Sequence, residues 1–162
     1  MTMHRPAEIL LVEDDPNDVE LTLRALRNAN SSLCVEVARD GEEALDYLLR
    51  RGQWRDRSAD HFPSFVLLDL KLPKIDGLQV LRQIKTATAT APIPIVVLTS
   101  SGEHRDIAES YRLGANSYVQ KPVDITEFRS TIRAIADYWL NVSQPSHPLP
   151  KPRPERSGAW PA

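Results

Sequence analysis

The sequence predicts an α/β fold, a doubly wound parallel sheet of five strands in the order 2-1-3-4-5 with helices on both faces. Two observations carry this prediction. Five short apolar runs alternate with longer stretches whose apolar residues recur at helical spacing. The first run, ILLV at residues 9–12, is bounded by charge, which is typical of a strand buried on both faces of a parallel sheet. Right-handed crossovers and this strand order give the simplest arrangement of such units.

The five predicted strands are short. In chain order they are residues 9–12, 34–38, 65–68, 93–98 and 117–119. A loop is predicted at residues 52–62, between the second helix and the third strand, because charged and aromatic side chains follow one another there without periodicity.

A helix is expected after each strand, and four of the five helices start at an aspartate. Asp is a preferred N-cap because its carboxylate accepts hydrogen bonds from the first free backbone N–H groups. The expected caps are Asp15, Asp40, Asp76 and Asp124, and the fourth helix is expected over residues 103–113. Pro16 suits the first helical position after Asp15. Glu43 and Glu127 follow Asp40 and Asp124 at the spacing of a capping box.

The last helix carries a regular apolar stripe. Its members step by three or four residues and are Ile125, Phe128, Ile132, Ile135 and Trp139. This spacing predicts that the whole stripe is buried. Tyr138, Leu140 and Val142 have no obvious place in the same core, and apolar side chains at a domain edge favour association. We therefore expect a symmetric homodimer that uses the fourth and fifth helices with the fifth strand, or the segment that follows.

The chain divides into one domain and a tail. Residues 1–142 hold all the predicted elements, and 162 residues suffice for one domain with a hydrophobic core. Residues 143–162 contain six prolines in twenty positions, so this segment is expected to be extended or disordered.

Composition excludes several classes of function. A net charge of −2 gives no sign of the basic face of a nucleic-acid binder. The single cysteine, Cys34, permits no intrachain disulfide, which fits a reducing compartment. No signal peptide and no membrane span of about 20 apolar residues is visible, so we expect a cytoplasmic protein without membrane contact.

Polar residues stand directly after several predicted strands. They are Glu13 and Asp14 after the first, Asp69 after the third, Thr99 at the end of the fourth and Lys121 after the fifth. The carboxyl ends of such strands form a crevice where the strand order reverses. Carboxylates gathered there repel one another and favour a cation. Hard oxygen ligands point to Mg²⁺, and a lysine and a hydroxyl on neighbouring strands suit the oxygens of a phosphoryl group.

These segments resemble the signature of CheY-like response regulator receivers. The acidic pair after the first strand is joined by FVLLDLKLPKIDG, PIVVLTSSG and GANSYVQKP, and the resemblance covers roughly residues 8–140. It implies a flavodoxin-like receiver fold and a two-component signalling domain rather than an enzyme, with only phosphotransfer and self-dephosphorylation chemistry. The stretch before the third strand and the ending IADYWLNVSQPSHPLP resemble single-domain regulators paired with phytochrome histidine kinases.

The resemblance implies a role for each residue of the crevice. Asp69 would accept a phosphoryl group from the phosphohistidine of a sensor histidine kinase. Asp14 and Asp69 would bind Mg²⁺ directly and Glu13 through a water molecule, and the backbone carbonyl of Lys71 would complete the protein ligands. Lys121 would pair with a phosphoryl oxygen beside a cis bond to Pro122.

The same resemblance implies a switch. Thr99 would donate its hydroxyl to the phosphoryl group, the small side chain of Ser100 would leave room for this movement, and Tyr118 would rotate inward. The altered surface would be recognised by an unknown downstream protein.

Two other functions compete with this one. A Mg²⁺-dependent phosphatase of the haloacid dehalogenase type also uses an aspartate at a strand end, but it needs a second aspartate two residues later as general acid, where this chain has Lys71. A degenerate receiver that binds partners constitutively is disfavoured by the complete set of crevice residues. Asp15 could be a further metal ligand, but its position before Pro16 favours the helix cap.

Overall fold

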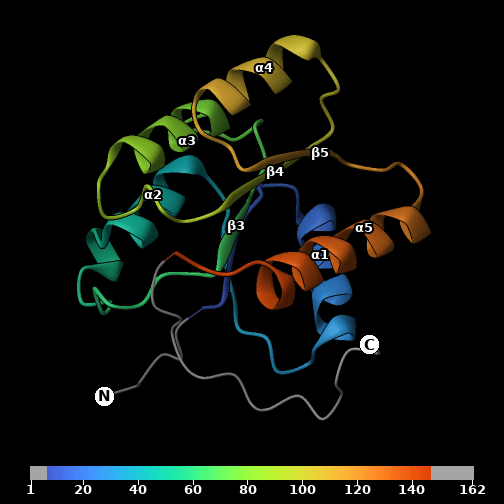
Figure 1. Ribbon diagram of the computed structural model, residues 1–162, viewed down its shortest axis with the longest axis horizontal. Coiled ribbons are helices and arrows are strands. Elements are labelled where there is room, and N and C mark those ends of the chain that lie inside the picture. Colours follow the sequence, from blue (N-terminus) through green and yellow to red (C-terminus); the bar gives the residue numbers. More distant parts are fainter. Residues whose placement is uncertain (1–6, 147–162) are drawn as a thin grey trace.

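Five parallel strands form the centre of the molecule in the computed structural model, which describes residues 7–146 (Figure 1). They are β1 (Ile9–Val12), β2 (Val35–Ala38), β3 (Phe65–Leu68), β4 (Ile95–Thr99) and β5 (Ser117–Gln120). Their order in the sheet is β2-β1-β3-β4-β5, which confirms the predicted doubly wound arrangement. Strand boundaries differ from the sequence prediction by one or two residues.

The register of the sheet sets the position of the polar residues at its carboxyl edge. Val12 at the end of β1 is paired with Leu68 at the end of β3. The residues that follow these two strands, Glu13 and Asp69, are therefore brought to the same place, and the backbone N–H of Asp69 donates to the carbonyl oxygen of Val12 at 3.0 Å.

Helices cover both faces of the sheet. They are α1 (Pro16–Ala29), α2 (Gly41–Leu49), α3 (Gly77–Thr86), α4 (His104–Arg112) and α5 (Ile125–Asp137). α1 and α5 pack together on one face, whereas α2 and α3 pack together on the other, with α4 beside α3 (Figure 1). No helix within residues 7–146 is long and apolar enough to cross a bilayer.

Alternate residues of β3 supply the two halves of the core. Phe65 and Leu67 lie in the apolar cluster under α1 and α5, whereas Val66 and Leu68 lie in the cluster under α2 and α3. All four side chains are buried, as expected for a central strand of a parallel sheet.

The four predicted aspartate caps are confirmed. Each carboxylate accepts a backbone N–H from the first turn of its helix: Asp15 in α1, Asp40 in α2, Asp76 in α3 and Asp124 in α5. α4 starts after Glu103, whose side chain makes no such hydrogen bond.

The prediction for the apolar residues of α5 and of the turn that follows it was wrong at three positions. Ile125 is 52% exposed because it is the first residue of the helix, beyond the reach of the core, and Leu140 is buried. α5 continues into a π-helical turn, η2 (Tyr138–Val142), closed by a hydrogen bond from Ser143 N–H to the carbonyl oxygen of Tyr138. The wider turn breaks the regular helical spacing, so the last fully buried residue is Leu140, while Trp139 is half-buried.

The segment predicted as a loop is fastened by an arginine. It includes a short 3₁₀ turn, η1 (Gly52–Trp54), and Trp54 packs edge-on against Tyr47 of α2. The Arg57 guanidinium lies over the Tyr47 ring and donates to the carbonyl oxygens of Tyr47, Leu48 and His61. The contacts with Tyr47 and Leu48 satisfy carbonyl oxygens that the end of α2 leaves without helical partners.

Gly77 allows α3 to approach the end of β3. A methyl group on Gly77 would overlap the backbone carbonyl oxygen of Asp69 and lie 2.5 Å from the α-carbon of Leu70. Backbone atoms cannot move aside as a flexible side chain can.

We expect Gly77→Ala to lower the free energy of unfolding by about 1–3 kcal/mol, the usual cost of overpacking. Urea denaturation followed by circular dichroism would measure it. Gly102→Ala is the matched control, because its methyl group would meet only the mobile amide end of Gln120. Equal midpoints for Gly77→Ala and the unsubstituted chain would show that α3 is not held at this distance.

Candidate functional site

Three carboxylates gather at the carboxyl edge of the sheet. Glu13 and Asp14 follow β1 and Asp69 follows β3, and one oxygen from each lies within 4.8 Å of the others. Glu13 and Asp69 are buried, whereas Asp14 is exposed. The structure thus brings together the three carboxylates that the sequence singled out. Their oxygens suit a divalent cation, because hard cations prefer several oxygen ligands.

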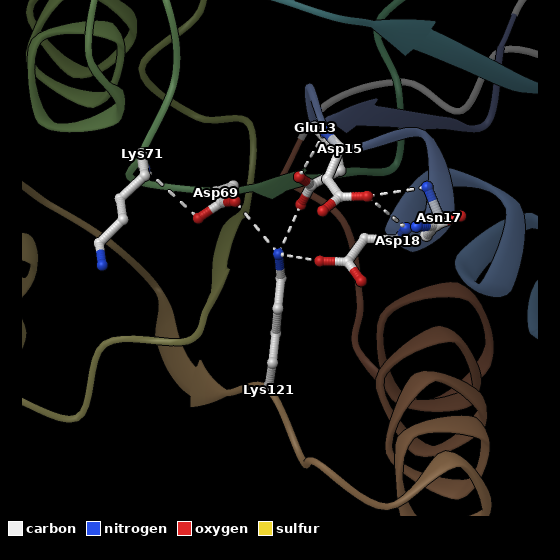
Figure 2. Close-up of polar contacts among 7 residues, drawn as sticks. All are labelled: Glu13, Asp15, Asn17, Asp18, Asp69, Lys71 and Lys121. Atoms are coloured by element: carbon white, nitrogen blue, oxygen red, sulfur yellow. Dashed lines mark hydrogen bonds and ion pairs between the residues drawn. The ribbon is translucent and has the colours of Figure 1, made fainter.

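Lys121 reaches into this cluster from the loop after β5 (Figure 2). Its ammonium lies 2.6 Å from Glu13 Oε2, 2.9 Å from Asp18 Oδ2 and 3.1 Å from Asp69 Oδ2. The backbone N–H of Lys121 donates to the carbonyl oxygen of Thr99 at 2.7 Å, which fixes the start of the loop against β4. The ammonium therefore ties together the ends of β1, β3 and β5.

Burial and charge act on these groups in opposite directions. Burial raises the pKa of Glu13 to about 7, although the hydrogen bond from Lys121 opposes this shift. Burial alone would lower the pKa of Lys121, but the hydrogen bonds to Glu13 and Asp18 and the charge of Asp69 raise it above its usual value. Three carboxylates thus contact one ammonium, and Asp14 lies beside two of them. The excess of negative charge favours a bound cation.

Asp15 and Asp18 both lie near the cluster but have different hydrogen-bond partners. The carboxylate of Asp15 accepts the backbone N–H groups of Asn17 and Asp18, so its interpretation as a helix cap is confirmed (Figure 2). Asp18 was not among the predicted site residues. The signal that could have found it is its position in the first turn of α1, because this helix starts at the carboxyl edge of the sheet directly after Glu13 and Asp14.

Thr99 ends β4, the neighbour of β3 in the sheet. Its hydroxyl is buried and has no hydrogen-bond partner among the described residues. A buried hydroxyl without a partner costs free energy, so this group is available to a ligand that enters the site. Ser100 is exposed, and its carbonyl oxygen accepts from the Gln120 amide at 3.3 Å.

Tyr118 of β5 is attached to the loop between β4 and α4. Its hydroxyl donates to the carbonyl oxygen of Ser101 at 2.8 Å. Ser101, which the sequence analysis did not single out, donates its own hydroxyl to Asp106 of α4 at 2.5 Å. Tyr118, Ser101 and Asp106 therefore link β5, this loop and α4.

Two expectations about the loops have different outcomes. The bond between Lys121 and Pro122 was expected to be cis, and this was wrong, because no peptide bond within residues 7–146 is cis. Trans is the favoured isomer even before proline. The backbone N–H of Lys71 lies 3.4 Å from Asp69 Oδ1, so Lys71 is adjacent to the cluster, but the role of its carbonyl as a ligand stays a prediction (Figure 2).

Known proteins are similar to this chain in sequence. Residues 9–133 match the family model of the response regulator receiver domain. The probable methanogenesis regulatory protein FilR2 of Methanothrix harundinacea is 42% identical, over 83% of this chain and 84% of that protein. The response regulator Rcp1 of Synechocystis sp. is 35% identical, over 83% of this chain and 90% of that protein.

Solved structures show the same similarity. The phosphorylated cyanobacterial phytochrome response regulator RcpA superposes with a TM-score of 0.81 at 36% identity, covering 87% of this chain and 99% of that one. The Mn²⁺-bound form of Rcp1 has a TM-score of 0.79 at 34% identity, with 86% and 99% covered. The bacteriophytochrome response regulator RtBRR has a TM-score of 0.70 at 49% identity, with 93% and 86% covered. On the family match and these similarities, this chain belongs to the response regulator receiver domain family.

Proposed function

We propose that this protein accepts a phosphoryl group on Asp69 from a sensor histidine kinase, with Mg²⁺ bound beside it, and signals through phosphorylation-dependent contacts with another protein. The observation that carries the proposal is the convergence of the Glu13 and Asp14 carboxylates on Asp69, with the ammonium of Lys121 3.1 Å from Asp69 Oδ2. The buried, unpartnered hydroxyl of Thr99 supports it.

In the proposed reaction, a carboxylate oxygen of Asp69 attacks the phosphorus of a phosphohistidine. The P–N bond breaks as the P–O bond forms, so the histidine side chain leaves and an acyl phosphate remains. Glu13, Asp14, Asp69 and the carbonyl of Lys71 would hold Mg²⁺, which neutralises charge on the phosphoryl oxygens when bound. Lys121 is already placed to pair with a phosphoryl oxygen, because its ammonium touches the acceptor carboxylate.

The proposed switch begins at Thr99. A hydroxyl that turns toward a phosphoryl oxygen draws the following residues with it, and Ser100 presents only a small side chain to that movement. The loop is held by the Tyr118 hydroxyl at the Ser101 carbonyl, so its displacement releases or redirects Tyr118. The surface of α4, β5 and α5 would then differ between the two states, and a downstream protein could distinguish them.

A phytochrome-type kinase is the proposed phosphoryl donor. The similarity to the phytochrome response regulator RcpA and to the bacteriophytochrome response regulator RtBRR supports this proposal. We also propose a cytoplasmic location, which fits a kinase partner and the presence of a single cysteine, Cys34. A haloacid dehalogenase-type phosphatase is not favoured, since Lys71 occupies the position of the needed acid. We propose no enzymatic turnover beyond phosphotransfer and self-dephosphorylation.

We also propose a homodimer and a division of the chain into a receiver domain, residues 1–142, and a tail, residues 143–162. The burial of Leu140 removes one of the side chains that suggested association, but Tyr138, Val142 and Tyr111 remain about half exposed on α4 and at the end of α5. Most of the tail, residues 147–162, lies outside the described residues.

Asp69→Asn should abolish labelling by phosphorylated kinase or acetyl phosphate in the presence of Mg²⁺, because the amide cannot attack phosphorus. The fold should persist, since the change removes one of several repelling carboxylates. Labelling can be followed by phosphate-affinity electrophoresis. Asp76→Asn is the matched control: it also removes one carboxylate near the site, and asparagine caps α3 equally well, so labelling should remain. Full labelling of Asp69→Asn would place the acceptor elsewhere.

Multi-angle light scattering tests the dimer. The full chain should have twice the monomer mass at tens of micromolar, and a chain ending at Asn141 should be monomeric, because it lacks Val142 and the tail. Tyr138→Ser in the full chain separates the contribution of the α5 surface from that of the tail. A full chain that is monomeric both with and without phosphorylation would exclude the homodimer.

A further inference from the structure

Lys121 has one partner that is not part of the cation cluster. Two of its three carboxylate partners, Glu13 and Asp69, belong to the group of oxygens that can hold a divalent cation. The third, Asp18, lies in the first turn of α1 and contacts the ammonium at 2.9 Å (Figure 2).

The position of the ammonium creates an electrostatic conflict. A divalent cation bound to Glu13 and Asp69 becomes a near neighbour of the Lys121 charge. The Lys121 side chain is only 10% exposed, so water screens this repulsion poorly. Unless another negative charge is close, the ammonium and the cation would compete for the same two carboxylates.

We propose that Asp18 is a positioning residue that allows Lys121 and a divalent cation to occupy the site together. When a bound cation neutralises the charges of Glu13 and Asp69, the Asp18 carboxylate remains as the counter-charge of the ammonium. Lys121 then stays beside the acceptor, where a phosphoryl oxygen can reach it. This inference rests on the proposed cation site and adds to it a residue of α1.

A simpler role for Asp18 is also open to test. An acidic residue in the first turn stabilises a helix through the helix dipole, and Asp18 occupies such a position in α1. That role does not depend on Lys121. The two roles therefore differ in whether the effect of removing the Asp18 charge requires the lysine.

The experiment is isothermal titration calorimetry of the full chain with Mg²⁺ alone, in a double-mutant cycle. Asp18→Asn should weaken Mg²⁺ affinity by a factor of roughly 3 to 30, which lies within the range of coupling between neighbours in one charge network. In the Lys121→Met background, Asp18→Asn should change the affinity less than about twofold. Asp18→Ser provides a second variant should Asp18→Asn fold poorly, and circular dichroism monitors the fold of each.

Glu20→Gln is the matched control, because it removes a carboxylate from the same helix whose partner is the exposed Arg24 at 2.6 Å. Its Mg²⁺ affinity should equal that of the unsubstituted chain. Unchanged affinity in Asp18→Asn, or equal losses with and without Lys121, would overturn the proposal. No phosphoryl donor is used, so a failure of Asp69 as acceptor does not affect the result. Absence of Mg²⁺ binding by the unsubstituted chain would instead contradict the cation site itself.

Discussion

The parallel pairing of β1 with β3 places two buried carboxylates, Glu13 and Asp69, at neighbouring strand ends. Such a pair is unfavourable by itself, because each ion loses hydration worth several kcal/mol and gains a like-charged neighbour. Lys121 offsets part of this cost through its contacts with both. The remaining negative charge favours a bound cation. The repulsion that destabilises the cluster is therefore also the reason that the site can hold a cation.

The apolar core supplies the rigidity that this arrangement requires. β1, β3 and β4 are buried along their whole length, and helices pack on both faces. α3 starts directly against the backbone of Asp69 because Gly77 has no side chain. The paired strands β1 and β3 and the start of α3 thus hold the carboxylate cluster in place.

Much of this architecture could be predicted from local patterns. Strand order, four aspartate caps and the gathering of Glu13, Asp14, Asp69 and Lys121 follow from periodicity and from the geometry of parallel sheets. Contacts made by helix side chains were not predicted in this way, because they depend on how each helix packs on the sheet. Asp18 meets Lys121 across 103 positions of sequence, and the burial of Leu140 depends on a π-helical turn that a fixed helical period does not anticipate.

The Arg57 anchor has a consequence for the substitutions that this chain can accept. It holds the segment before β3 mainly through backbone carbonyls, which every residue possesses, and through the ring of Tyr47. Trp54 and Phe62 pack against the core, but the exposed side chains between these anchor points are under little constraint from the fold. This segment leads into the amino end of β3, whereas the carboxylates follow the carboxyl ends of β1 and β3. Substitutions of its exposed residues would therefore change the molecular surface without altering the proposed phosphoryl site.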